Sequence, residues 1–106
     1  MFNFFSKNPN NLDGNAFKNE FKSTKNAVLL DVRTPNEYNG GSIPGSKNMD
    51  CTASDFQAKV QKLDPDKTYF IFCRSGGRSG GAVKLMEKMG FKSFNLVGGI
   101  SSWPKQ

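Results

Sequence analysis

The sequence contains no histidine and only two cysteines, Cys51 and Cys73. Two cysteines are too few for a disulfide framework, and no set of residues has the spacing of a zinc site. The absence of histidine also excludes a Ser-His-Asp triad and any phosphatase that depends on a histidine. We therefore expect no metal and no cofactor, and any nucleophile in this chain must be activated without an imidazole base.

Long apolar segments are missing as well. No run approaches the ~20 apolar residues that a membrane-spanning helix needs. The N-terminus, MFNFFSKNPNN, lacks the charged region and the long apolar region of a secretory signal. We expect a cytoplasmic protein that does not bind a membrane, or a periplasmic protein if a signal peptide has been removed.

Basic residues outnumber acidic ones, 15 to 9, which gives a formal net charge of +6. The lysines are scattered between Lys7 and Lys105, with no dense basic run and no nucleic-acid-binding motif. We therefore expect no nucleic-acid partner. The positive charge is instead suited to attracting small anions.

The 106 residues fit one domain. We expect an Asn-rich, aromatic tail or flap at 1–11 and the domain itself at 12–106. Apolar runs of strand length predict strands at 27–32, 47–49, 69–72 and 93–97. Helical spacing predicts a helix that contains Phe17 and Phe21 with Asp13 or Asn15 as its cap, a short helix from Pro35, a helix at 54–63 with Thr52 or Ser54 as its cap, and a helix at 78–89. Because strands alternate with helices, the chain should form an α/β domain with a mostly parallel sheet and helices on both faces.

The segment CRSGGRS, residues 73–79, lies between a predicted buried strand and a predicted helix. Ligand sites in such folds lie beyond the carboxyl ends of the strands, which is where Cys73 is expected. Gly76 and Gly77 allow the backbone to curl, so that its N–H groups converge into an anion-binding nest at a helix N-terminus. Together with the charges of Arg78 and Arg74, these donors should lower the pKa of Cys73 and make it a thiolate at neutral pH.

A free cysteine is often an inert buried residue. For Cys73 that interpretation is disfavoured, because two arginines and two glycines make a poor core filler and a good anion cradle. Cys51 follows a short predicted strand and is expected near the same sheet edge. A resolving thiol and a plain small residue are both open for Cys51, and the second is favoured because no cationic cluster surrounds it.

Two cysteine chemistries use a loop of this kind. A thiolate can attack a phosphate ester, or it can accept a sulfane sulfur and become a persulfide. Four residues separate Cys73 from Arg78. Phosphatase loops are one residue longer, which suits a tetrahedral oxyanion, and usually have a histidine before the cysteine, where this chain has Phe72. The shorter cradle favours sulfur transfer over a phosphatase or arsenate reductase.

Four motifs in order resemble those of a single-domain rhodanese, a thiosulfate sulfurtransferase-like module. They are LLDVRTPNEY at 29–38, GSIPGSKN at 41–48, CRSGGRS at 73–79 and LVGGISSW at 96–103. The resemblance runs from about residue 14 to residue 103, nearly the whole chain. It implies a rhodanese-like α/β fold with a central sheet of about five strands and helices on both faces.

The resemblance also implies a ping-pong cycle. Cys73 would take sulfane sulfur from a small anionic donor such as thiosulfate, and the persulfide would pass it to cyanide or to a thiol acceptor, which can belong to a partner protein. Asp31 and Arg33 would brace the loop, with a plain structural ion pair as the alternative. The residues that would hold the persulfide and the donor are Arg74, Ser75, Gly76, Gly77, Arg78 and Ser79.

The alternative function within this fold is a sulfur carrier or regulatory module that acts with a partner protein, and a monomer is the simplest assembly. The sequence departs from the family pattern at Ser42, where a histidine is frequent, so we expect altered loop packing without loss of chemistry. Gly80 and Gly81 occupy the first turn of a predicted helix, where Ala is a better helix former by up to ~1 kcal/mol each. The helix start is therefore either soft or closely packed.

Overall fold

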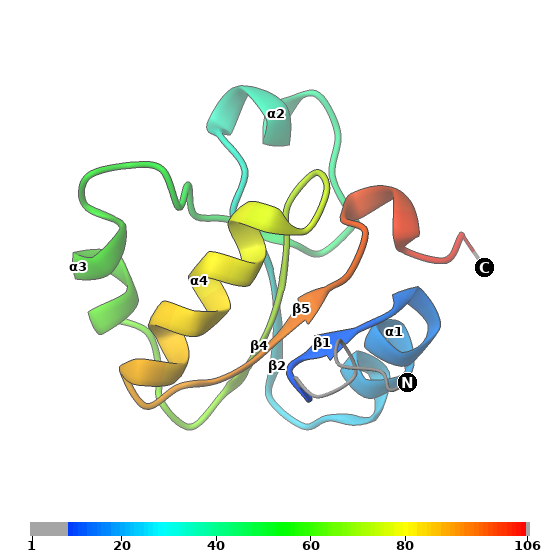
Figure 1. The fold of residues 1–106 in the computed structure, drawn as a ribbon, viewed down its shortest axis with the longest axis horizontal. Helices are drawn as coiled ribbons and strands as arrows, with labels where there is room; N and C mark the ends of the chain where they lie inside the picture. The colour runs from blue at the N-terminus through cyan, green and yellow to red at the C-terminus, as the bar shows by residue number, and fades with distance from the viewer. Residues whose placement is uncertain (1–8, 106) are drawn as a thin grey trace, which may run out of the picture.

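The computed structural model describes residues 9–105. They contain a five-stranded sheet in the order β1-β5-β4-β2-β3, in which every strand pair is parallel (Figure 1). This architecture confirms the predicted α/β class and the predicted number of strands. The strands are β1 (Asn11–Leu12), β2 (Ala27–Asp31), β3 (Lys47–Asn48), β4 (Thr68–Phe72) and β5 (Lys92–Leu96).

Helices cover both faces of this sheet. Helix α1 (Gly14–Ser23) packs on one face, whereas α3 (Phe56–Gln61) and α4 (Gly77–Lys88) pack on the other. Helix α2 (Pro35–Asn39) lies beyond the ends of the strands, at the top of Figure 1. A short 3-10 helix, η2 (Ile100–Ser102), follows β5.

Side chains along the two central strands alternate between two core clusters. Leu30 and Ile71 lie in the cluster beneath α3 and α4. Phe70 lies in the other cluster, where Phe17 and Phe21 of α1 meet its ring edge-on, each at a centroid distance of 5.5 Å. Both faces of the central strands are therefore buried, which explains why their sequences form continuous apolar runs.

The helix caps agree with the sequence in one case and differ in another. Asp13 accepts a hydrogen bond from the Ala16 N–H at 2.9 Å and begins α1, as predicted. The helix predicted at 54–63 is shorter, and its N-cap is Asp55, which makes no side-chain cap bond. The expectation that Thr52 or Ser54 caps α3 was wrong, because the Thr52 hydroxyl donates to Asp50 Oδ1 at 2.6 Å within a turn.

Strand β1 adds a pairing that periodicity could not show. Asn11, expected in the tail, pairs with Asn95, and Leu12 pairs with Leu96. Two residues are too few for a strand pattern, so β1 exists because the edge of β5 offers unpaired backbone groups. Residues 1–8 of the predicted tail lie outside the described residues.

The carboxyl ends of the strands meet at one edge of the sheet. Asp31 at the end of β2 is in register with Phe72 at the end of β4, so the segments that follow both strands lie together. The segment after β5 closes the third side, where the Ile100 N–H donates to the Cys73 carbonyl at 2.8 Å. A Cβ on Gly99 would overlap the Arg74 carbonyl, so only glycine allows these two loops to approach this closely.

Candidate active site

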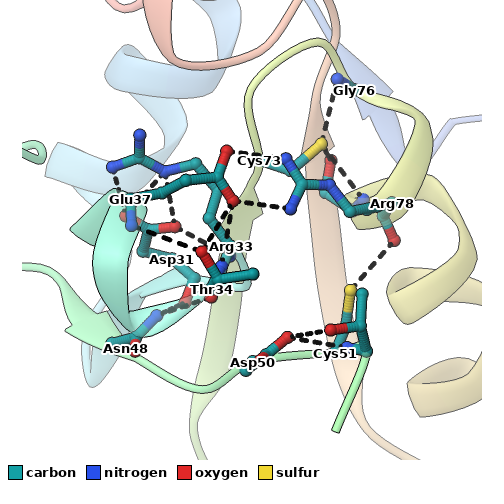
Figure 2. A network of polar contacts seen from close by, with 12 residues as sticks. Asp31, Arg33, Thr34, Glu37, Asn48, Asp50, Cys51, Cys73, Gly76 and Arg78 are labelled. Atoms are coloured by element: carbon teal, nitrogen blue, oxygen red, sulfur yellow. Dashed lines mark hydrogen bonds and ion pairs between the residues drawn. The ribbon is translucent and has the colours of Figure 1, made fainter.

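Cys73 follows β4 directly, and its side chain is completely buried. The chain curls around the sulfur because Gly76 has a φ of +104°, a left-handed conformation that favours glycine. The Cys73 sulfur accepts hydrogen bonds from the Gly76 N–H at 3.0 Å, the Ser79 N–H at 3.3 Å and the Ser79 hydroxyl at 3.2 Å. Figure 2 shows the sulfur beneath the Gly76 amide, at the point where α4 begins. The loop therefore presents the unpaired amides of a helix N-terminus to a thiol.

These contacts decide the protonation of the thiol. Burial raises the pKa of Cys73, but the hydrogen bonds from the Ser79 hydroxyl and from the amides of Ser79, Gly76 and Ser75 outweigh it, so the pKa lies below that of an ordinary cysteine. The donors favour the thiolate because hydrogen bonds to a charged acceptor are the stronger ones. The sequence interpretation gave the arginines a share in this effect, whereas the main lowering contributions come from hydrogen bonds.

Ser79 is the side chain that contacts the sulfur, and it has a second partner. Its hydroxyl oxygen lies 2.5 Å from Asn95 Oδ1 as well as 3.2 Å from the Cys73 sulfur. The hydroxyl has a single proton, so it can serve only one of these two acceptors at a time. Asn95 is held by its own bond from Nδ2 to Asn11 Oδ1 at 3.0 Å, which ties this pair to β1.

Arg78 projects from the first turn of α4 and forms an ion pair with Glu37 of α2 (Figure 2). The two guanidinium nitrogens lie 2.8 and 3.1 Å from the two carboxylate oxygens. Sequence reasoning assigned Arg78 to donor binding and did not assign Glu37 to the site. Glu37 lies in the motif at 29–38, which begins in β2 and continues past the carboxyl end of that strand, and this position is the signal that would have placed it at this edge.

Arg74 and Ser75 are exposed at the mouth of the loop, and Gly77 is the first residue of α4. Between residues 9 and 105, no ion pair engages the Arg74 guanidinium. Of the predicted loop residues, Gly76 and Ser79 donate to the Cys73 sulfur, and in the described residues one of the two loop arginines is paired whereas the other has no ion-pair partner.

Asp31 and Arg33 form a buried pair with each other. The Arg33 guanidinium contacts both Asp31 oxygens at 2.7–3.1 Å and also donates to the Gly41 carbonyl at 2.7 Å. Ser42 donates to Asp31 Oδ2 at 2.7 Å and lies 2.8 Å from the Ser46 hydroxyl. Within the described part of the chain, no hydrogen bond joins Asp31 or Arg33 to residues 73–79. The pair therefore contacts the segment around residues 41–46, including Ser42, and not the loop at 73–79.

Cys51 lies on the other side of the start of α4. Its thiol donates to the Arg78 carbonyl at 3.9 Å, and burial raises its pKa. Both cysteines are free, so no disulfide joins them.

The start of α4 contains glycine without a need for close packing. A Cβ on Gly81 would meet no atom within 4 Å, and one on Gly80 would lie 3.6 Å from Asn95 Nδ2, an ordinary contact. These contacts do not show the close packing that was one interpretation of the two glycines, and a soft helix start stays a prediction.

Among residues 9–105, no three His, Cys, Asp or Glu side chains gather in a way that could hold a metal ion. None of the helices there is long and apolar enough to cross a membrane.

The parallel sheet and the cysteine held by amides at a helix start define an α/β protein with a cysteine-centred site. Comparison with known proteins gives its family. The family model for the Rhodanese-like domain matches residues 14–106, so this chain belongs to the rhodanese-like family. It is 35% identical over 88 residues to the Bacillus subtilis protein named "Putative sulfurtransferase YtwF", covering 83% of this chain and 84% of that one. It is 34% identical over 89 residues to the B. subtilis protein named "Putative sulfur carrier protein YrkF", covering 83% of this chain and 47% of that one.

A solved structure of a rhodanese-like domain protein from Staphylococcus aureus has the same fold. The TM-score is 0.76 and the sequence identity is 26%, and the match covers 91% of this chain and 92% of that one. The rhodanese resemblance stated from the four motifs is thereby confirmed, together with a general role in sulfur transfer.

Proposed function

We propose that this protein is a sulfurtransferase that carries sulfane sulfur as a persulfide on Cys73. The observation that carries the proposal is the environment of this sulfur, which accepts hydrogen bonds from two amides and one hydroxyl inside a loop with no histidine. Such donors stabilise the thiolate that attacks the donor, and they equally suit the negative terminal sulfur of a persulfide.

In the first half of the cycle, the Cys73 thiolate attacks the outer sulfur of a donor such as thiosulfate. A new S–S bond forms as the old one breaks, and sulfite leaves with the electron pair. In the second half, an acceptor attacks the outer sulfur of the persulfide and returns Cys73 as a thiolate. Cyanide becomes thiocyanate in this step, and a thiolate acceptor becomes a persulfide.

The loop residues share the work of binding. The amides of residues 74–79 would hold the persulfide, and Arg74, exposed and unpaired within the described range, would attract an anionic donor. Arg78 would contribute to donor binding as an ion pair with Glu37 and not as an isolated charge. Asp31 and Arg33 would support the site by shaping the neighbouring segment.

A second candidate is a sulfur carrier or regulatory module whose acceptor is a thiol on a partner protein. The name of one relative, a sulfur carrier protein, favours this candidate. It uses the same Cys73 persulfide and differs only in the acceptor. No contact in the described residues favours a phosphatase or arsenate reductase, and the short loop argues against both.

Intact-protein mass spectrometry tests the proposal. The wild type, Cys73→Ala and Cys51→Ala are incubated with thiosulfate and then with cyanide. We expect the wild type and Cys51→Ala to gain the mass of one sulfur atom and to lose it to cyanide as thiocyanate, and Cys73→Ala to gain none. Sulfur loading that survives in Cys73→Ala would overturn the assignment of the nucleophile. Loading that thiols discharge and cyanide does not would favour the carrier.

A further inference from the structure

Arg78 is engaged by Glu37 before any donor arrives. The two-point geometry, at 2.8 and 3.1 Å, is that of a strong arginine–carboxylate pair. Glu37 is itself fixed in place, because the Thr34 N–H and hydroxyl both donate to its Oε1 at 3.1 Å in the capping box that begins α2 (Figure 2). The hydrogen bond from Arg78 and the backbone bond from Thr34 lower the pKa of Glu37 to about 2, so its carboxylate is charged throughout the neutral range.

The pairing leaves Arg74 as the loop guanidinium with a free charge in the described structure. When Cys73 is a thiolate, its negative charge balances that of Arg74, and Glu37 balances Arg78. The remaining arginine of the chain is neutralised by its buried aspartate partner. The free Cys73 thiolate, the three arginines and their two carboxylate partners therefore form a group of side chains whose charges sum to zero.

We infer that Glu37 sets the charge of the sulfur donor, so that the site selects donors with one negative charge, such as alkyl persulfides and organic thiosulfonates, over the dianion thiosulfate. This inference rests on the proposed function. When the charged side chains around the sulfur sum to zero, they supply no net attraction to offset the repulsion between the thiolate and a second negative charge on the donor. Without the charge of Glu37 the site would be positive, and a dianion would gain about twice as much Coulomb energy from that change as a monoanion.

Organic thiosulfonates and thiosulfate react through the same atoms. The Cys73 thiolate attacks the terminal sulfur of R–SO2–S⁻, the S–S bond to the sulfonyl group breaks, and the electron pair leaves on the sulfinate R–SO2⁻. Reactants and products each carry two negative charges. With thiosulfate the same exchange releases sulfite, and reactants and products each carry three negative charges. The two donors therefore differ at the site mainly by one charge.

The test is the ratio of kcat/KM for thiosulfate to kcat/KM for benzenethiosulfonate, with cyanide as the acceptor. Glu37→Gln removes the charge and keeps the capping box, since Gln also serves at this helix position. We expect the ratio to rise about fivefold in Glu37→Gln. The lost negative charge is screened, but it acts on the two charges of thiosulfate and on only one charge of benzenethiosulfonate. Glu87→Gln, an exposed change of equal charge farther along α4, should leave the ratio as in the wild type.

Arg78→Gln and the double variant Glu37→Gln/Arg78→Gln complete the cycle. Arg78→Gln leaves Glu37 uncompensated, so the ratio should fall by about the same factor, and the double variant should return to the wild-type ratio. If Arg78 bound the donor directly, the ratio for the double variant would stay as low as for Arg78→Gln, and the inference would be overturned. It is also overturned if Glu37→Gln and Glu87→Gln give equal ratios. Failure of both donors to load the wild type would remove the proposed function itself, and this inference with it.

Discussion

The two cysteines lie on opposite sides of a single peptide group. The N–H of the peptide that joins Arg78 to Ser79 donates to the Cys73 sulfur at 3.3 Å, whereas its carbonyl accepts the Cys51 thiol at 3.9 Å. Burial raises the pKa of both thiols. Only Cys73 has enough donors for its pKa to be lowered overall, so the same backbone unit stabilises a thiolate on one side and a thiol on the other.

The comparison shows that reactivity in this loop depends on the direction of the donors more than on the presence of a cysteine near the sheet edge. Both sulfurs lie near the first turn of α4, and Arg78 is close to both. What separates them is the curl at Gly76, which turns amides and a hydroxyl toward Cys73 alone. Cys51 accordingly fits the small, inert residue that the sequence favoured, although its role in sulfur transfer stays a prediction.

The largest expected effect on this contrast comes from Ser79→Ala. Among residues 9–105, it removes the one side-chain donor to the Cys73 sulfur. A hydrogen bond to a charged group is worth roughly 1.5–3 kcal/mol, or about one to two pKa units. The rate of sulfur loading at pH 7 should fall about tenfold and recover partly at higher pH. Ser101→Ala removes an exposed hydroxyl of η2 and serves as the control. Equal rates in Ser79→Ala and the wild type at pH 7 would show that the Ser79 hydroxyl donates to Asn95 Oδ1 and not to the sulfur.

A smaller effect is expected in the pH dependence of stability, with opposite signs for the two thiols. The lowered pKa of Cys73 means that the unfolded chain binds more protons below pH ~8.5, so its contribution to stability rises with pH in that window and is lost as pH falls through the native pKa. The raised pKa of Cys51 means that its contribution is present below pH ~8.5 and is lost as pH rises.

Urea unfolding of Cys73→Ala and Cys51→Ala between pH 6 and pH 10 measures this difference, at about 1.4 kcal/mol per unit of pKa difference. Relative to the wild type, Cys73→Ala should lose the rising part of the curve and Cys51→Ala the falling part. Parallel curves for all three proteins would contradict the opposite shifts.

Much of the fold could be predicted from the sequence, because the central strands are buried on both faces and therefore appear as apolar runs. The runs at 27–32 and 69–72 correspond to β2 and β4, and Phe17 with Phe21 marked α1. Strand β1 could not be predicted, since two residues have no period and form a strand only by pairing with β5. The predicted cap of α3 was also wrong, because the Thr52 hydroxyl donates to Asp50 in a local turn.

The site was only partly predictable, for a related reason. Cys73 and its glycine-rich loop form a local motif, and the helix dipole and the amides follow from the local sequence. The partners that adjust the motif come from far along the chain: Glu37 reaches Arg78 across 41 positions, and Asn95 reaches Ser79 across 16. A predicted donor-binding arginine thus has a carboxylate partner in another of the four motifs, and only the fold brings the two together.

The most direct test of this account is a titration of each thiol alone. The ultraviolet absorbance of the thiolate is followed against pH in Cys51→Ala, which retains only Cys73, and in Cys73→Ala, which retains only Cys51. We predict that Cys73 ionises below the pKa of about 8.5 of a free cysteine and that Cys51 ionises above it. If Cys73 ionised at the same pH as Cys51 or at a higher one, the hydrogen-bonded cradle would not be the source of its reactivity.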